Sequence, residues 1–194
     1  MKNSIYEFTR EDWNTLYPIH LEDHNPEWKT IFEKEKELIL SNIDSKYFEK
    51  IEHFGSSSIP GIKSKPYIDI FIIIPEAYLF DKELIKAFEN LGYFHFEVPA
   101  REDIEAYSSF GKGYRVDGKK EQIFHIHMCP SSNIMCKQLG FRDYLIANPE
   151  KARAYENLKI ALANKFKNDR GAYVLGKTEF TKEIIKLWKA SKTS

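Results

Sequence analysis

The chain has 194 residues, 42% of them hydrophobic and 14% aromatic, which excludes a disordered, collagen-like or low-complexity protein. Its 29 basic and 29 acidic residues cancel, so no overall positive field favours nucleic acid or anionic lipid as a partner. The apolar run that contains Phe71–Ile74 is too short to cross a membrane, and the first residues do not resemble a signal peptide. With only two cysteines, Cys129 and Cys136, we expect a reduced, cytoplasmic location.

Hydrophobic periodicity and turn residues predict strands in the first two thirds of the chain and helices in the last third. Asn25 and Pro26 should begin the first helix, in which Glu33–Glu37 is expected to form a solvated face. Strands are expected at residues 47–53, 67–74 and 122–129, with further strands between 93 and 128 and a hairpin turn at Asp117–Gly118; helices are expected at residues 81–91, 134–147, 149–167 and 178–190.

This order of elements predicts the α+β class. A mixed β-sheet core should occupy about residues 45–130, with flanking helices, and the C-terminal helices about residues 133–190. We expect the whole of residues 1–194 to form one domain, since no linker or repeat divides the chain.

Asp69 is the residue that most needs an explanation, because it interrupts an otherwise apolar predicted strand. A buried, unpaired carboxylate costs several kcal/mol or neutralises, so a cation, a set of backbone N–H groups or a metal should compensate it. The preceding Gly55–Ser58 turn is rich in hydroxyl groups suited to phosphate oxygens, and Lys65 supplies a nearby positive charge. The structural alternative is an N–H-rich turn with Asp69 at a frayed strand end.

His125 and His127 lie two residues apart on a predicted strand and should therefore point to the same face of the sheet. They could bind a metal, donate hydrogen bonds to a phosphate, or be ordinary exposed sheet residues. A zinc site with Cys129 and Cys136 is disfavoured, because the spacing fits none of the usual zinc patterns.

Residues 171–178 match the GxxxxGK[ST] pattern of a phosphate-binding loop. That loop must follow a strand, whereas the preceding residues 160–168 have a helical pattern, and too few residues follow for a second strand. We therefore expect residues 171–178 to connect two helices, with Lys177 free to face a site and Thr178 capping the last helix.

Several segments together resemble the GrpB family: Asn25–Trp28, Glu52–Gly61, Lys65–Ile70, the His125–His127 pair and Phe141–Leu145. The similarity covers residues 20–188, and the glycine-serine loop and the Phe-Arg-Asp-Tyr-Leu segment are its most specific parts. The resemblance implies a fold like that of the nucleotidyltransferases related to DNA polymerase beta. It also indicates nucleotide or coenzyme metabolism, since some related domains are joined to dephospho-coenzyme A kinase.

In that superfamily a Gly-Ser turn holds a nucleoside triphosphate, and acidic residues on the following strand bind divalent metal. Carried over, Gly55–Ser56 is the turn and Asp69 the first acid, with residues 57–68 between them. The chain departs from the active pattern at the second acid, where Phe71 stands, and His125 and His127 occupy the strand expected to carry a third acid. A single carboxylate with imidazoles is a poor magnesium site and suits manganese, zinc or iron better.

Two functional hypotheses remain open. The first is an enzyme that transfers a nucleotidyl group or cleaves a phosphate ester, with Mg²⁺ or Mn²⁺ as cofactor. Its expected residues are Asp69 and His127 for catalysis, Asp69, His125 and His127 for metal, and Gly55, Ser56, Ser57, Lys65, Arg142 and Lys177 for phosphate. The second is a non-catalytic domain that binds a nucleotide or another phosphorylated small molecule on the same fold.

Overall fold

A five-stranded mixed sheet organises the protein, whose computed structural model describes residues 4–101, 104–117, 119–167 and 169–192. The spatial order of the strands is β1-β2-β5-β4-β3. The β2–β5 pair is parallel, and the other neighbouring pairs are antiparallel. The strands are β1 (Lys50–Phe54), β2 (Tyr67–Ile74), β3 (Phe94–Val98), β4 (Tyr107–Lys112) and β5 (Ile123–Pro130).

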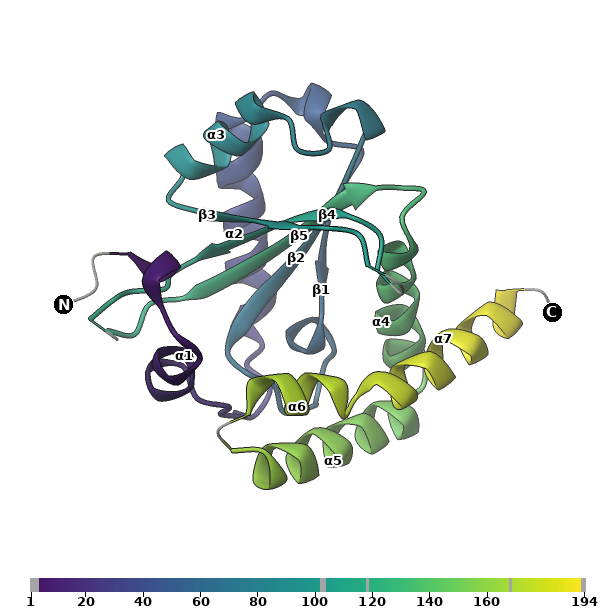
Figure 1. The fold of residues 1–194 in the computed structure, drawn as a ribbon. Helices are drawn as coiled ribbons and strands as arrows, with labels where there is room; N and C mark the ends of the chain where they lie inside the picture. The colour runs from purple at the N-terminus through teal and green to yellow at the C-terminus, as the bar shows by residue number, and fades with distance from the viewer. Residues whose placement is uncertain (1–3, 102–103, 118, 168, 193–194) are drawn as a thin grey trace.

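Helices lie on both sides of this sheet (Figure 1). The figure shows α3 above the strands and α5, α6 and α7 below them, with α2 passing behind and α4 beside the sheet. The α-helices are α1 (Arg10–Leu16), α2 (Glu27–Asn42), α3 (Lys82–Asn90), α4 (Lys137–Ala147), α5 (Pro149–Lys165), α6 (Arg170–Leu175) and α7 (Thr178–Lys192). The predicted α+β class and the helical last third of the chain are confirmed.

Alternation along β2 divides its side chains between two chemically different faces of the sheet. Ile68, Ile70, Ile72 and Ile74 are fully buried in a core cluster with side chains of α2 and α3. The opposite face carries Asp69 and Phe71, and Phe71 packs with residues of β1, β5 and α4. The first face is therefore the main apolar core, and the second is the face on which polar residues gather.

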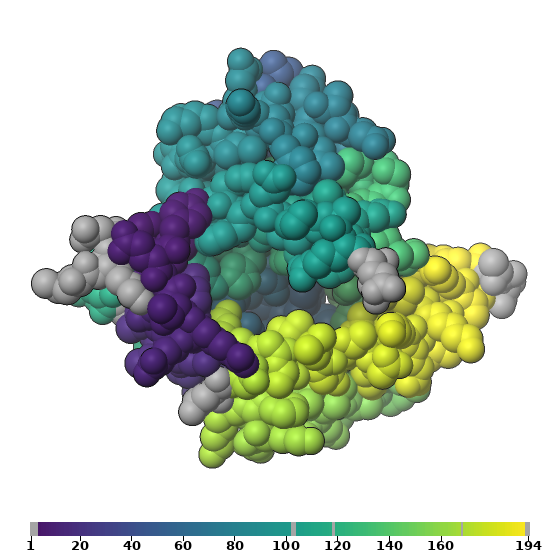
Figure 2. Space-filling model, in the orientation of Figure 1, coloured from purple at the N-terminus to yellow at the C-terminus, as the bar shows by residue number. Residues whose placement is uncertain are grey.

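The second face borders a hollow in the molecular surface (Figure 2). Segments of α1 in purple, the teal strand region and α6 in yellow-green surround this hollow, and deeper strand residues are visible within it. No helix of the described residues is long and apolar enough to cross a membrane.

Most predicted boundaries agree with the structure, and the differences have physical causes. The expected strand at residues 47–53 begins later, at Lys50, because Asp44 accepts a hydrogen bond from the Lys46 N–H and starts a short 3-10 helix at Ser45–Tyr47. The helix expected to begin at Asn25 and Pro26 begins at Glu27, with Pro26 in the N-cap position, and the Glu27 N–H donates to Asn25 Oδ1 over 2.9 Å. The predicted turn at Asp117–Gly118 includes Gly118, which lies outside the described residues.

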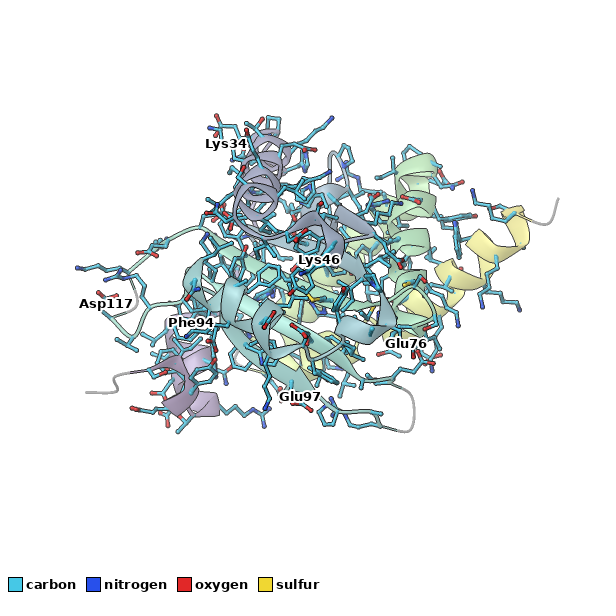
Figure 3. The ribbon with its side chains drawn as sticks, turned by 90° about the horizontal axis from the view of Figure 1, so that it is seen from above. Lys34, Lys46, Glu76, Phe94, Glu97 and Asp117 are labelled. Atoms are coloured by element: carbon cyan, nitrogen blue, oxygen red, sulfur yellow. The ribbon has the colours of Figure 1, made fainter. Side chains whose placement is uncertain are left out.

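The expectation that Glu33–Glu37 forms a solvated face is wrong at Glu35. Its side chain is only 7% exposed, and its carboxylate accepts hydrogen bonds from the Tyr93 hydroxyl at 2.7 Å and Lys112 Nζ at 2.6 Å. Figure 3 shows the neighbouring Lys34 on the outer side of α2, away from the sheet. Glu35 therefore lies on the inner face of the helix, where it accepts hydrogen bonds from Tyr93, just before β3, and from Lys112 at the end of β4.

The loop between β1 and β2 is fastened to α5 by buried polar groups. The Lys63 N–H donates to Glu156 Oε1 over 2.5 Å, and Lys159 Nζ donates to the Lys63 carbonyl. Glu156 and Lys159 are 4% and 1% exposed, so these contacts are shielded from water. They fix the loop that begins with the glycine-serine turn against the C-terminal helices.

Candidate functional site

The turn after β1 places the Gly55 backbone directly against the Asp69 carboxylate. Phe54, the last residue of β1, is the register partner of Asp69, so the chain turns beside that side chain. Gly55 has φ 70° and ψ −171°, a conformation that is essentially restricted to glycine. A Cβ atom at this position would lie 2.3 Å from Asp69 Oδ2. The close approach therefore requires glycine for both conformation and space.

Asp69 lies in the interior of β2, between partners on both sides, and not at a frayed strand end. Its register partner on β5 is His125, whose Nδ1 atom lies 3.3 Å from Asp69 Oδ1. The other ring nitrogen of His125, Nε2, is hydrogen-bonded to the Tyr114 hydroxyl. An imidazole thus compensates the carboxylate that interrupted the apolar sequence.

The electrostatic surroundings favour the charged form of Asp69. Burial, the largest single influence, raises the pKa of this carboxyl. The hydrogen bond to His125 and the electrostatic influence of His125, His127 and Lys65 together lower the pKa by more. Asp69 is consequently an anion within a group of basic side chains.

Lys65, Arg170 and Lys177 form a group of basic side chains on this side of the sheet. Burial, followed by the charges of Arg170 and Lys177, lowers the pKa of Lys65 to about 7, although Asp69 opposes the shift. Lys65 Nζ lies 4.6 Å from the centre of the Tyr67 ring, and Lys177 Nζ lies 4.7 Å from that of Tyr173. Because these basic side chains outnumber the single carboxylate, the group can attract an anionic ligand.

Two cavities flank the Asp69–His125 pair on this face of the sheet. The larger, of about 410 Å³, is called the Asp69 cleft; it is lined by residues of the β1–β2 turn, β2 and helices α4 to α7, among them Gly55, Ser56, Asp69, Gln138, Phe141, Tyr155, Lys177, Thr178, Thr181 and Lys182. The smaller, of about 270 Å³, is called the His125 cavity and is lined by residues that include Trp13, Phe96, Ser109, Tyr114, His125, His127 and Arg170.

His127 lies on the same face as Asp69 and His125, as the alternation on β5 predicts. Its ring stacks on Tyr107, with centres 5.5 Å apart, and meets the edge of Phe54. Burial lowers the pKa of His127 to about 4, so the ring is neutral near pH 7, and its Nδ1 atom is buried without a hydrogen-bond partner among the described residues. An unengaged nitrogen of a neutral imidazole is able to accept a proton.

The structure places Gly55, Ser56 and Lys177 in the lining of the Asp69 cleft but not Lys65, Ser57 or Arg142. Arg142 and Ser57 line a different cavity, of about 470 Å³, together with Glu52 and His53. Arg142 Nη1 donates to Glu52 Oε2 at 2.8 Å and to the His53 carbonyl at 2.6 Å, and so ties α4 to β1. Ser57 is 1% exposed, with its hydroxyl 3.1 Å from His53 Nε2. Both residues hold the turn in place from behind the Asp69 cleft.

The protonation of His53 should make the protein's stability fall as the pH is lowered. Burial, ahead of the charges of Arg142 and His24 and against that of Asp69, lowers the pKa of His53 in the folded protein to about 4. The unfolded chain, with a histidine pKa of about 6.5, binds this proton first, so stability is lost as the pH falls from about 6.5 toward 4.

His53→Gln removes the titrating group and keeps a donor for Ser57. Between pH 7 and pH 4.5 the wild-type protein should lose about 1 to 2 kcal/mol more stability than this variant, as measured by urea unfolding at both pH values. His20→Gln, at an exposed position, is the control. Identical pH dependence in wild type and His53→Gln would contradict the assignment.

Residues 171–178 connect two helices, as the sequence predicts. They include most of α6 and the first residue of α7, and the described part of the chain before them is the helix α5, not a strand. Lys177, at the junction of α6 and α7, faces the Asp69 cleft together with Thr178. The match to the phosphate-loop pattern is therefore coincidental, because the segment does not have the strand–loop–helix architecture of that loop. Its lysine, Lys177, nevertheless faces the cleft.

The residues present do not fit a two-metal magnesium site. Phe71, where a second carboxylate would be needed, is 0% exposed and packs edge-on against Phe54. Within the part of the chain that the structure describes, no group of three or more His, Cys, Asp or Glu side chains is arranged to hold a metal ion. The two cysteines are free thiols, Cys129 being part of the apolar cluster that contains Phe71.

Sequence reasoning missed Tyr114 and Arg170. Tyr114 follows β4, and its hydroxyl is hydrogen-bonded to His125. Arg170 is the first residue of α6, a helix that the sequence pattern did not predict. Arg170 Nη1 donates to the Tyr17 carbonyl at 2.7 Å and its guanidinium lies 5.9 Å from the Trp13 ring centre, so it joins α6 to the N-terminal segment. The only sequence signal for it was its position just before the phosphate-loop match.

The fold and the cleft define an α+β protein with a single carboxylate set among basic side chains beside a glycine-serine turn. The sequence profile described as GrpB protein matches residues 18–187. The chain belongs to the GrpB family.

Curated relatives and a solved structure agree with this assignment. The chain is 34% identical over 163 residues to the glutamate-rich protein GrpB of Alkalihalophilus pseudofirmus, a match that covers 84% of the chain and 91% of that relative. It is 31% identical to the UPF0157 protein YqkA of Bacillus subtilis over 92% of the chain, and spans 51% of that relative's length. The crystal structure of the conserved protein GrpB from Enterococcus faecalis superposes with a TM-score of 0.75 at 27% identity, over 90% of this chain and 100% of that one.

Proposed function

We propose that this protein binds the phosphate groups of a nucleotide or another phosphorylated small molecule in the Asp69 cleft, on a nucleotidyltransferase-like fold. The observation that carries the proposal is the convergence of the Gly55–Ser56 turn and Lys177 on one cavity of about 410 Å³. These groups come from segments more than a hundred residues apart, and together they offer backbone N–H groups, a hydroxyl and a cation.

The chemistry of these groups suits phosphate. Hydroxyls and turn N–H groups donate to phosphate oxygens, and lysine ammonium groups neutralise their charge. Lys65 and Lys177 are close enough for the charge of one to lower the pKa of the other, so an anion bound between them would relieve their repulsion. Phe141 and Tyr155 add aromatic walls to the same cleft, against which a base or another apolar group could pack.

A second candidate function is nucleotidyl transfer or phosphate-ester cleavage between the Asp69 cleft and the His125 cavity, which His127 lines. The observation that favours it is the neutral ring of His127, whose Nδ1 atom is buried and has no hydrogen-bond partner among the described residues. Such a nitrogen would accept the proton of an attacking hydroxyl or water, with Asp69 and His125 next to it. Replacing His127 by Gln should then abolish turnover while leaving ligand affinity within about threefold.

Lys177→Gln is the variant that tests phosphate binding. Loss of a charge-assisted contact, worth about 1.5 to 3 kcal/mol, should weaken the affinity for nucleoside triphosphates about 10- to 100-fold in calorimetric titrations. The matched control is Lys186→Gln, which removes a lysine from an exposed position in α7 outside the cleft. Equal weakening by both substitutions would show only a general charge effect, and no binding of any triphosphate by the wild-type protein would contradict the proposal.

A further inference from the structure

We infer that the Asp69 cleft holds its anionic ligand with the protein's own basic side chains and without a divalent metal ion between protein and phosphate. This inference rests on the proposed phosphate binding and specifies how the charge of the ligand is balanced. It follows from how the potential metal ligands are already used and from the cations in and beside the cleft.

The protein pairs one oxygen of the Asp69 carboxylate with a histidine and packs the Gly55 backbone close to the other. Oδ1 lies 3.3 Å from His125 Nδ1, and Oδ2 faces the Gly55 backbone so closely that a Cβ atom there would be 2.3 Å from it. A metal ion needs an accessible lone pair and about 2 Å of clear approach to the ligand oxygen. The Asp69 side chain is 27% exposed, but one of its oxygens is paired with His125. Among the described residues, no second carboxylate lines the cleft to complete a metal site with it.

The histidines are likewise poorly placed as ligands. His125 uses Nδ1 toward Asp69 and Nε2 toward the Tyr114 hydroxyl, so a metal would have to displace one of these partners. The ring of His127 is stacked on Tyr107 and held by the edge of Phe54. Phe71, fully buried, supplies no oxygen where a second carboxylate would complete a magnesium site.

The cations that remain supply the charge that a metal would otherwise bring. Burial, followed by the charges of Arg170 and Lys177, lowers the pKa of Lys65 to about 7, whereas the charge of Asp69 raises it. Lys65 and Lys177 form no salt bridge with any described residue, and their ammonium groups lie over tyrosine rings. Adding a divalent cation to this group would add repulsion, whereas adding a phosphate would remove it.

The inference is tested by titrating ATP into the wild-type protein in EDTA and, separately, in excess MgCl₂. Free ATP carries more negative charge than its magnesium complex, so we expect affinity in EDTA to equal or exceed that in magnesium. Titration of MgCl₂ or MnCl₂ alone should give no binding heat. Affinity at least tenfold tighter in magnesium, or saturable binding of either metal alone, would overturn the inference while leaving phosphate binding intact. Absence of ATP binding in both solutions would instead contradict the proposed function, and the inference with it.

Asp69→Asn gives an independent measurement. With no metal bridge, removal of the negative charge next to the phosphate should tighten ATP binding about threefold or more in EDTA, since the carboxylate repels the ligand. If the carboxylate held a metal, the same substitution would abolish binding in magnesium. A thermal melt of the variant establishes that it is folded, and the comparison of EDTA with magnesium in the wild-type protein decides the question should the variant fail to fold.

Discussion

Replacing Gly55 by alanine should lower the free energy of unfolding by about 3 to 5 kcal/mol. Two effects combine at this position. The backbone at φ 70° and ψ −171° is strained for any residue with a Cβ atom, at about 1 to 3 kcal/mol. The new Cβ would also lie 2.3 Å from Asp69 Oδ2, and this side chain is itself packed against His125, so relief of the overlap must shift β1 or β2. Urea unfolding of the variant measures the loss.

Gly61→Ala separates the two effects. Gly61 also has positive φ, at 77°, but a Cβ there would meet no atom within 4 Å, so only the backbone strain applies. The double variant Gly55→Ala/Asp69→Ala should be less destabilised than the sum of its single substitutions, because the shortened side chain removes the overlap. Equal losses for Gly55→Ala and Gly61→Ala would contradict the close packing of the turn on Asp69.

Replacing Glu35 by alanine should be comparably damaging, at about 3 to 5 kcal/mol, because it leaves buried partners without a counter-charge. The side chain is 7% exposed, and its carboxylate joins α2 to Lys112 at the end of β4 and to Tyr93 just before β3. Lys112 is itself only 23% exposed at its side chain, so it cannot recover full hydration when its partner is lost. The thermal unfolding midpoint of Glu35→Ala should fall by several degrees or more.

Glu33→Ala is the matched control, because it removes a carboxylate from an exposed position on the same helix. It should change stability by less than about 0.5 kcal/mol. The variant Glu35→Gln, which can still accept from Tyr93 but lacks the charge, should fall between the two. A Glu35→Ala protein as stable as Glu33→Ala would show that the carboxylate is not a structural link between α2 and the sheet.

The sequence predicts best those helices and strands whose structure depends mainly on interactions between neighbouring residues. The run Tyr67–Ile74 forms β2 with the predicted bounds. A stretch of this length that is rich in β-branched residues and lies between turn residues strongly favours a strand over a helix. Asp81 caps α3 as expected, accepting from the Leu84 N–H at 2.8 Å. By contrast, α1 and α6 were not predicted. α1 does carry a local signal, the Thr9–Asp12 capping box. α6 depends on contacts such as that of Arg170 with the distant Tyr17 carbonyl.

The candidate site could be predicted only in part, because strand register and loop direction are long-range properties. The spacing of His125 and His127 correctly places them on one face, next to Asp69. No local pattern could show that Tyr114 occupies His125 Nε2, or that Arg142 points to Glu52 and away from Asp69. Adjacent residues of the turn are also divided: Ser56 faces the cleft, and Ser57 is buried against His53.

A crystal structure of the protein grown with a non-hydrolysable nucleoside triphosphate tests the central claim most directly. We predict electron density for phosphate in the Asp69 cleft, within hydrogen-bond distance of the Ser56 turn and Lys177, with no metal ion joining it to Asp69. Phosphate density in the cavity of Arg142 and Glu52, or a metal ion coordinated by Asp69 and the phosphate, would contradict the account.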